Sequence, residues 1–148
     1  MRAIVDSNVY VSYLLGSENT GKIGEVFGLA AQGRIRLALP PEQIEELQRA
    51  ITTKRYLRER IRLADLEQFI VLLRSLGDIL SPVQGEPPRV LRDRNDDFLI
   101  ESAKQNEIEL IVSGDRDLLE WQDASPNLKV VPPAMLKQYL ESRETDQS

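Results

Sequence analysis

The sequence predicts an α/β fold, a three-layer α/β/α sandwich with a mainly parallel central sheet. Short apolar segments typical of strands alternate with longer segments whose apolar residues recur every three or four positions, the spacing of one helix face. Strands separated by helices are joined by right-handed crossovers and pair in parallel. A chain of 148 residues with 41% hydrophobic residues can bury the core of one domain.

The first half of the chain is predicted to hold two strands and three helices. Asp6-Ser7-Asn8 has residue types that leave a strand and cap a helix, and Gly33 is a typical helix stop. Pro40-Pro41 is compatible with the start of a helix. In chain order we expect a strand at 2–5, helices at 8–15 and 21–32, a strand at 35–39 and a helix at 41–53.

The second half continues the alternation. The segment 57–76 keeps helical spacing up to Gly77, as one helix or two consecutive pieces. The proline in 79–83 makes that segment an edge-strand candidate, and a long loop precedes a helix that starts near Asn95. The remaining expected elements are strands at 110–112 and 130–131 and a helix at 133–142, within a domain of residues 1–140 that is followed by a polar tail, 141–148.

The composition restricts the chemistry. The chain has no cysteine and no histidine, which excludes disulfides, thiol nucleophiles and imidazole catalysis and leaves oxygen atoms as metal ligands. The apolar run before the first acid has only three residues, too few for a signal peptide, and no apolar run elsewhere approaches a membrane-spanning length. We therefore expect a soluble cytoplasmic protein that does not associate with membranes.

Carboxylates follow two of the predicted strands. Asp6 comes directly after the first strand, and Asp115, with Asp117 two positions later, follows the most apolar one. In such sheets ligands bind beyond the carboxyl ends of the strands, so we expect these acids at one edge. Asp96 and Asp97 begin a helix nearby in the sequence. Each acid alone has an alternative interpretation as a helix cap, and the hypothesis of a functional site depends on the whole set.

The helix predicted over 41–53 offers further acids. Its apolar residues define a face centred nearer to Glu46 than to Glu45, while Glu42 points away from the core. Glu46 is therefore a candidate for the site, and a solvated position at the boundary of the face is the alternative.

Carboxylates crowded into one place repel each other, so they must protonate, pair with bases or bind a cation. Hard oxygen ligands favour Mg²⁺ or Mn²⁺. Ions held in this way activate water and stabilise charge on a phosphate, which makes phosphodiester hydrolysis the leading hypothesis.

Four short motifs carry a resemblance to a known family. They are Asp6-Ser7-Asn8, Ile44-Glu45-Glu46-Leu47, Asp96-Asp97-Phe98-Leu99 and Ser113-Gly114-Asp115-Arg116-Asp117-Leu118-Leu119. In this order they resemble the PIN-domain ribonucleases, close to VapC-type toxin components, over residues 1–140. The 18 positions from Asp97 to Asp115 match the family's usual interval. The resemblance implies cleavage of single-stranded RNA with one or two Mg²⁺ or Mn²⁺ ions, homodimers, and often a small antitoxin protein as partner.

Carried over position by position, the resemblance implies that the catalytic and metal-binding acids are Asp6, Glu46, Asp97 and Asp115. Asp117 lies in the matching segment and can complete the ligand shell. Asn8 and Ser113 match polar positions near the metal. The chain departs from many relatives at Pro40-Pro41, where they have a serine or threonine ahead of the glutamate helix.

An acidic protein can still bind RNA if its charges are separated. Without the five candidate acids, 19 acidic side chains stand against 19 basic ones. The main basic stretch supplies the candidate RNA-binding residues, with Tyr56 as a ring for base stacking. These bases are Arg49, Lys54, Arg55, Arg58 and Arg60, and a second candidate patch comprises Arg89, Arg92 and Arg94. A solvated charged face is the alternative interpretation of the first stretch.

Two other classes of protein are compatible with parts of this pattern. The first is a catalytically silent PIN-like module that binds RNA or protein, and the intact acids of all four motifs argue against it. The second is a phosphotransfer receiver or phosphatase, which also needs an aspartate after the first strand. The segment Asp6-Ser7-Asn8 lacks the paired acids usual in those folds.

Overall fold

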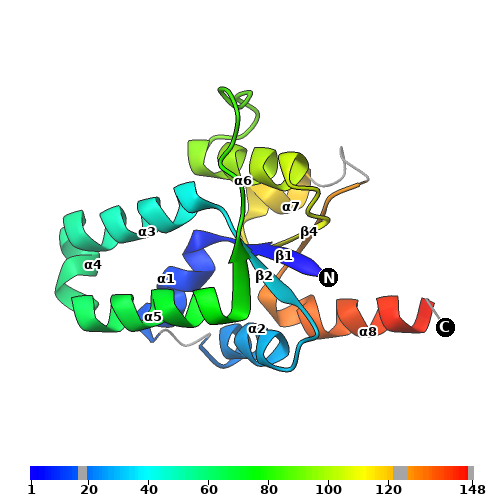
Figure 1. Ribbon diagram of the computed structural model, residues 1–148, viewed down its shortest axis with the longest axis horizontal. Helices are drawn as coiled ribbons and strands as arrows, with labels where there is room; N and C mark the ends of the chain where they lie inside the picture. Colours follow the sequence, from blue (N-terminus) through cyan, green and yellow to red (C-terminus); the bar gives the residue numbers. More distant parts are fainter. Residues whose placement is uncertain (17–19, 122–126, 147–148) are drawn as a thin grey trace.

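The chain forms a parallel sheet of five strands, seen in a computed structural model that describes residues 1–16, 20–121 and 127–146 (Figure 1). The strand order is β3-β2-β1-β4-β5, and every pair of neighbours is parallel. This confirms the predicted α/β class. The strands are β1 (Arg2–Val5), β2 (Arg36–Leu39), β3 (Gly77–Ile79), β4 (Leu110–Val112) and β5 (Lys129–Val131).

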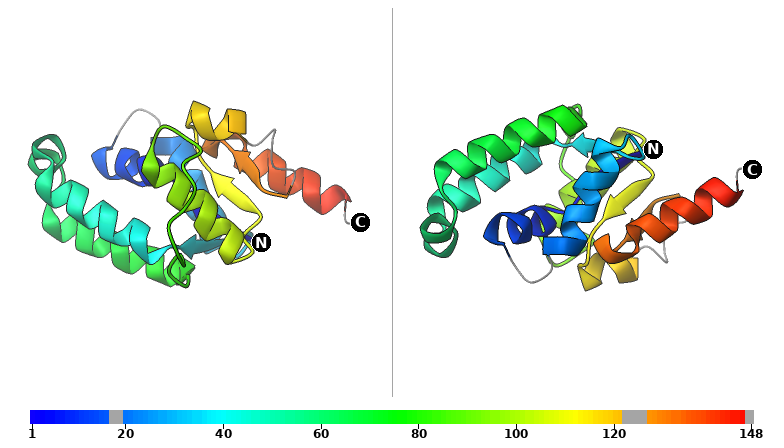
Figure 2. Two further views of the ribbon diagram at one scale, coloured as in Figure 1. Left: turned by 90° about the horizontal axis from the view of Figure 1, so that it is seen from above. Right: turned by 90° about the horizontal axis from the view of Figure 1, so that it is seen from below.

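Helices cover both faces of the sheet (Figure 2). Along β1 the side chains of Ala3 and Val5 pack into one apolar cluster, and that of Ile4 packs into the other, as the alternation of side chains along a strand requires. Helices α6 and α7 supply the second cluster, and the other long helices supply the first. The helices are α1 (Ser7–Leu15), α2 (Thr20–Ala31), α3 (Pro41–Thr53), α4 (Arg55–Arg60), α5 (Leu63–Leu76), α6 (Arg94–Gln105), α7 (Arg116–Trp121) and α8 (Leu136–Asp146), with a short 3₁₀ helix, η2 (Pro133–Met135), before α8.

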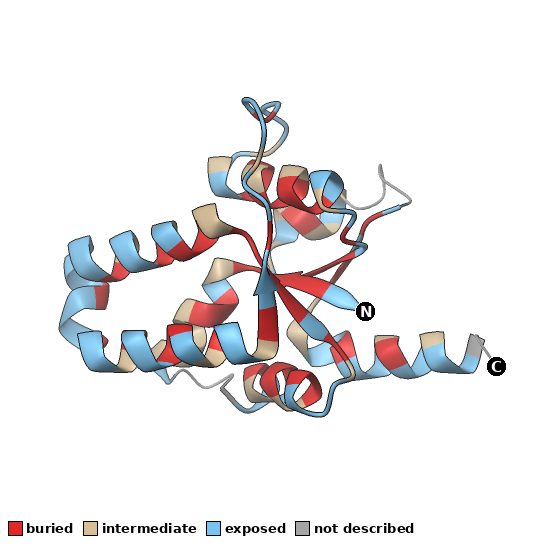
Figure 3. Cartoon of the chain, in the orientation of Figure 1, coloured by how far each residue is buried: buried red, intermediate tan, exposed pale blue. Residues whose placement is uncertain are grey.

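The three helices α3, α4 and α5 form a helical arm that projects from the sheet (Figure 1). The expected helix over 57–76 is divided, because Ile61 and Arg62 adopt extended backbone between α4 and α5. Apolar residues of the arm such as Leu47, Phe69 and Leu73 belong to the first apolar cluster, in which Phe69 packs against aromatic rings of α1 and α2. The outer faces of the arm are exposed (Figure 3).

The edge strand β3 differs from the expectation. It covers Gly77–Ile79 rather than 79–83, so Gly77 begins a strand and Pro82 lies beyond it. A side chain at position 77 would meet the backbone carbonyl of Leu37 on β2, with the Leu37 Cβ only 2.7 Å away. Glycine is therefore required here by the close approach of two strands, and not by the end of a helix.

Two further elements extend beyond the sequence expectation. Residues 116–121 form helix α7, which no pattern had singled out. Helix α8 continues to Asp146, so residues 141–146 of the expected polar tail are helical. None of the helices in the described ranges is long and apolar enough to cross a membrane.

Candidate functional site

The carboxyl edge of the sheet brings the first acid into place. Val5 on β1 lies opposite Val112 on β4, so Asp6 and Ser113 leave the sheet side by side. The Asp6 carboxylate is buried and accepts two hydrogen bonds, from the Ser113 hydroxyl at 2.7 Å and from the Asn8 backbone amide at 3.2 Å. The second of these caps α1, so the predicted capping role and a position in the site coexist at Asp6.

Ser113 connects Asp6 to the second acid. Its fully buried hydroxyl donates to Asp6 and accepts a hydrogen bond from the backbone amide of Asp115 at 3.0 Å. The Asp115 carboxylate in turn accepts from the Asp117 backbone amide at 2.8 Å, which fixes its direction at the start of α7. Asp6 and Asp115 are thus both oriented by bonds from the protein itself.

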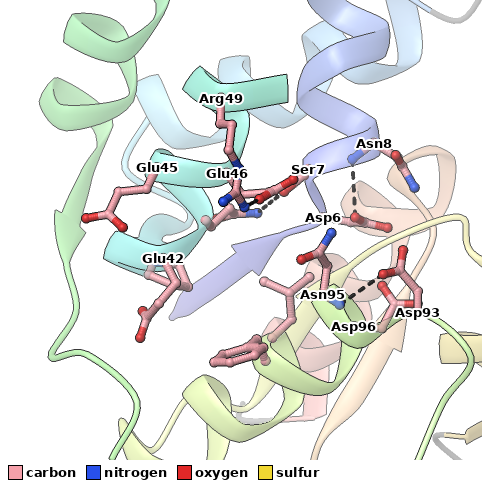
Figure 4. A pocket seen from close by; sticks show the side chains of 14 residues that line it. Asp6, Ser7, Asn8, Glu42, Glu45, Glu46, Arg49, Asp93, Asn95 and Asp96 are labelled. Carbon is pink, nitrogen blue, oxygen red and sulfur yellow. Dashed lines mark hydrogen bonds and ion pairs between the residues drawn. The ribbon is translucent and has the colours of Figure 1, made fainter. Parts of the chain in front are cut away.

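Asp96, at the start of α6, is the third member of this group. Carboxylate oxygens of Asp6, Asp96 and Asp115 all lie within 4.8 Å of one another. The Asp96 carboxylate is buried, and its Oδ2 atom has no hydrogen-bond partner among the residues that the structure describes. Asp93 caps α6 beside it, through a hydrogen bond from the Asn95 backbone amide at 2.9 Å (Figure 4). We call these three aspartates the acidic cluster.

Two members of the acidic cluster, Asp6 and Asp96, have raised pKa values. Burial, followed by repulsion from Asp6 and Asp115, raises the pKa of Asp96 to about 8. Burial also raises the pKa of Asp6, although the hydrogen bonds from Ser113 and Asn8 oppose that change. At neutral pH the metal-free cluster therefore holds a proton on Asp96, which a cation bound there would displace.

Asp97, which the sequence predicted as a ligand, has a different environment. Its Oδ1 atom accepts hydrogen bonds from the backbone amides of Val90 and Leu91, at 3.2 and 2.9 Å, and its Oδ2 atom lies 3.5 Å from the Arg94 guanidinium. Asp97 therefore holds the loop before α6 against that helix. In the described ranges it is Asp96, not Asp97, that joins the group with metal-binding geometry.

Glu46 lies beside the acidic cluster and outside it. A cleft of about 360 Å³ separates α3 from α6, and Glu46 lines this cleft together with Asp6 and Asp96 (Figure 4). Its carboxylate pairs with Arg49 one turn later on α3. Asn8 also lines the cleft, while Asp117 lines a separate hollow next to Trp121 on α7.

Gln43 was not singled out by the sequence, although it fixes α3 against the site. Its buried side-chain amide donates to the Val5 carbonyl at 2.6 Å and to the Ser7 hydroxyl at 3.2 Å. Glu42, expected to point away from the core, is half-buried and accepts a hydrogen bond from the Val83 amide at 2.7 Å. Gln43 precedes Ile44 and lies four positions before Leu47, so its place beside the apolar face of the helix was a sequence signal of this tether.

The candidate RNA-binding bases occupy the helical arm. Arg49 lies in the cleft, whereas the others lie on or next to α4 at the far end of the arm, about 15–20 Å along α3 by helix geometry (Figure 1). Arg55 pairs with Glu59, and the Arg60 guanidinium lies 4.0 Å from the centroid of the Tyr56 ring. Lys54 and Arg58 are exposed.

Only two of the three arginines of the second basic patch are free of ion pairs with described residues. Arg89 and Arg92 are exposed on the loop before α6. Arg94 instead pairs with Glu86 at 2.5 Å and approaches Asp97, so it belongs to the contacts that hold this loop.

The donor set of the acidic cluster fits a hard divalent cation. Two oxygens bound to one Mg²⁺ ion lie at most about 4 Å apart, close to the limit of 4.8 Å within the cluster. The unpartnered Asp96 Oδ2 atom is a buried acceptor that a cation would satisfy. The fold and the site thus define an α/β protein with a carboxylate centre able to bind metal.

Comparison with known families identifies this class more closely. The PIN domain family model matches residues 2–117, and the chain belongs to this family. PIN domains are in general nucleases that use divalent metals. A search of curated proteins found no match.

Proposed function

We propose that this protein is a metal-dependent endoribonuclease that cleaves single-stranded RNA, with Mg²⁺ or Mn²⁺ held by Asp6, Asp96 and Asp115. The observation that supports this most strongly is the convergence of three carboxylates, one with an unpartnered buried oxygen, at the carboxyl edge of a PIN-domain sheet. We assign Asp96 in place of Asp97, because both Asp97 oxygens already face donors of the loop and of Arg94.

The residues around such a metal site have different roles. A divalent cation bound there would supply an activated water and stabilise charge on the phosphate. Ser113 and the amide of Asn8 orient Asp6, and the amide of Asp117 orients Asp115, so these two ligands need little rearrangement. Glu46 lies at the margin of the site, where Arg49 balances its charge.

The test is cleavage of a labelled pool of single-stranded RNA with and without Mn²⁺. We expect metal-stimulated cleavage that Asp6→Asn and Asp96→Asn abolish while both variants stay folded by circular dichroism. Asp97→Asn is the matched control, because it makes the same chemical change at the adjacent residue and should retain cleavage. RNA binding without turnover by the wild-type protein would contradict the proposal and favour the catalytically silent binding module.

We propose that the exposed bases at the end of the helical arm bind the RNA backbone away from the acidic cluster. Replacing Arg55, Arg58 and Arg60 by glutamine should weaken binding and reduce the slope of log affinity against log salt by about 2–3. The control variant replaces three exposed bases elsewhere, Arg74, Lys129 and Lys137. An equal slope in the two triple variants would eliminate this surface.

We also propose that the protein is a homodimeric, VapC-type toxin component with a small antitoxin partner. Large exposed apolar side chains on α5 support an interface there, since Leu63 is 59% and Val71 is 68% exposed. Light scattering measures the dimer directly. Growth arrest on expression, relieved by Asp6→Asn, tests the toxin role, and unimpaired growth with the active enzyme would contradict it.

A further inference from the structure

The cleft between α3 and α6 opens directly beside the acidic cluster. Asp6 and Asp96 form part of its wall, so anything bound in the cleft lies next to the proposed metal ligands (Figure 4). Its volume of about 360 Å³ is within the range of sites for small organic groups. The character of its walls indicates which part of a substrate it accepts.

Away from a bound cation, the negative charge of the cleft disfavours a phosphate. Its acidic lining residues are Asp6, Glu42, Glu45, Glu46, Asp93 and Asp96. Arg49 is the single basic residue among those described that line the cleft, and it pairs with Glu46. Beyond the reach of a cation held by Asp6 and Asp96, an RNA phosphate would meet net negative charge, so the rest of the cleft favours an uncharged group.

Helix α6 presents a flat apolar surface and an amide to this cleft. Asn95, Phe98 and Leu99 are spaced three and four positions apart, which places them on one side of the helix, and all three line the cleft. Leu99 is buried, and the Phe98 ring is half-buried, with the Arg94 guanidinium over one of its faces at 5.5 Å from the ring centroid. A base can therefore stack only on the other face of the ring. The exposed side-chain amide of Asn95 makes no hydrogen bond to any other described residue, so its donor and acceptor are available to a ligand.

A second hollow of about 430 Å³ lies on the other side of Asp6. Asp6 and Asn8 line both spaces, and the second one is also lined by Asp115 and by Lys22, which supplies a positive charge. A single RNA strand that crosses the acidic cluster can thus direct its backbone phosphates towards Lys22 and an uncharged group into the cleft.

We infer that the cleft between α3 and α6 is a subsite for one unstacked nucleobase adjacent to the cleaved phosphodiester, stacked on Phe98 and read by the Asn95 amide. This inference rests on the proposed function. A base is flat and uncharged, and its edge carries the donors and acceptors that an asparagine amide recognises. Such a subsite requires the base to leave its stack, which explains a preference for single-stranded RNA.

The test combines Phe98→Leu with single abasic substitutions along a labelled single-stranded RNA oligomer. In the wild-type protein, removing the base next to the cut site should weaken binding roughly fivefold to a hundredfold, the range for loss of one base stack. Phe98→Leu should weaken binding of the complete oligomer comparably, and the two changes together should cost little more than either alone. Additive losses would overturn the inference, because they would show that ring and base act independently.

Asn95→Ala provides a second test that leaves the apolar surface intact. We expect it to change the preference among the four bases at that one position, whereas Gln48→Ala, which removes an exposed amide elsewhere on the arm, should not. An unchanged base preference in Asn95→Ala would show that the Asn95 amide does not recognise the base. If cleavage depends on metal but an abasic position has no effect, the subsite is refuted and the proposed function is not. If binding depends on the base but no cleavage occurs, the proposed function is refuted and the subsite is not.

Discussion

Exchanging either of two adjacent acids for asparagine tests which residue belongs to the metal centre. Asp96 faces Asp6 and Asp115, and its raised pKa of about 8 keeps it mainly protonated at pH 7 without metal. Asparagine resembles a protonated carboxyl group, so Asp96→Asn should change the melting temperature of the metal-free protein by no more than about 2 °C.

The rise in melting temperature on adding Mn²⁺ should be much smaller in Asp96→Asn than in the wild-type protein. At a Mn²⁺ concentration 100-fold above its dissociation constant, binding stabilises the wild-type protein by about 2.7 kcal/mol, which corresponds to a rise in melting temperature of roughly 5–10 °C. If loss of one charged ligand weakens binding tenfold, the same concentration stabilises Asp96→Asn by only about 1.4 kcal/mol.

Asp97→Asn should show the opposite pattern. It weakens charge-assisted hydrogen bonds from the Val90 and Leu91 amides and the contact with Arg94, at a cost of roughly 1–2 kcal/mol, or about 3–6 °C. Its response to Mn²⁺ should equal that of the wild type. Thermal melts with EDTA and with Mn²⁺ at pH 7 measure both quantities. A full Mn²⁺ response in Asp96→Asn together with none in Asp97→Asn would refute the assignment.

Three further predictions concern the same structure. The raised pKa of Asp96 makes the folded state hold a proton that the unfolded state has lost, so the free energy of unfolding of the metal-free protein should fall as pH rises from about 4 to 8. Mn²⁺ affinity should rise up to about pH 8, with proton release measurable by calorimetry in two buffers. A free energy of unfolding and a Mn²⁺ affinity that do not change with pH would contradict the raised pKa. Ser113→Ala removes a buried hydrogen bond to Asp6 and should cost about 1–3 kcal/mol in urea unfolding. Gly77→Ala should destabilise by about 2 kcal/mol or more, because its methyl group would overlap the backbone of Leu37; a stability equal to wild type would show that β2 and β3 separate easily.

Strands β1, β2, β4 and β5 were predictable because each contains a short apolar run next to polar or turn-forming residues. Leu110-Ile111-Val112 is buried on both sides, as its continuous apolar character indicated. The boundary at Gly77 was not predictable in the same way. Glycine is compatible both with the end of a helix and with close approach of two backbones, and only the position of Leu37 distinguishes these cases.

The candidate site was also only partly predictable from the sequence. The residues alone predicted that acids after the first and fourth strands lie at one edge, since parallel strands end on the same side of a sheet, and that any metal ligands are oxygens, since the chain has no histidine or cysteine. The structure added that these two strands are neighbours. Spacing along the chain did not distinguish Asp96 from Asp97, because the adjacent apolar residues Phe98 and Leu99 left the buried face of the helix undefined. That choice depends on the rotation of α6, which is set when Leu99, Ile100 and Ala103 pack against the sheet.

Asp96 lies three, four and seven positions before those apolar residues and therefore shares their buried face, while Asp97, about 100° further round the helix, meets the loop at Val90 and Leu91. The sequence by itself thus determined the fold class, the edge of the sheet that carries the acids, and the hard character of the ligands. Only the tertiary structure decided which carboxylates meet, because packing of a whole helix face, rather than the identity of any one residue, sets the direction of each side chain.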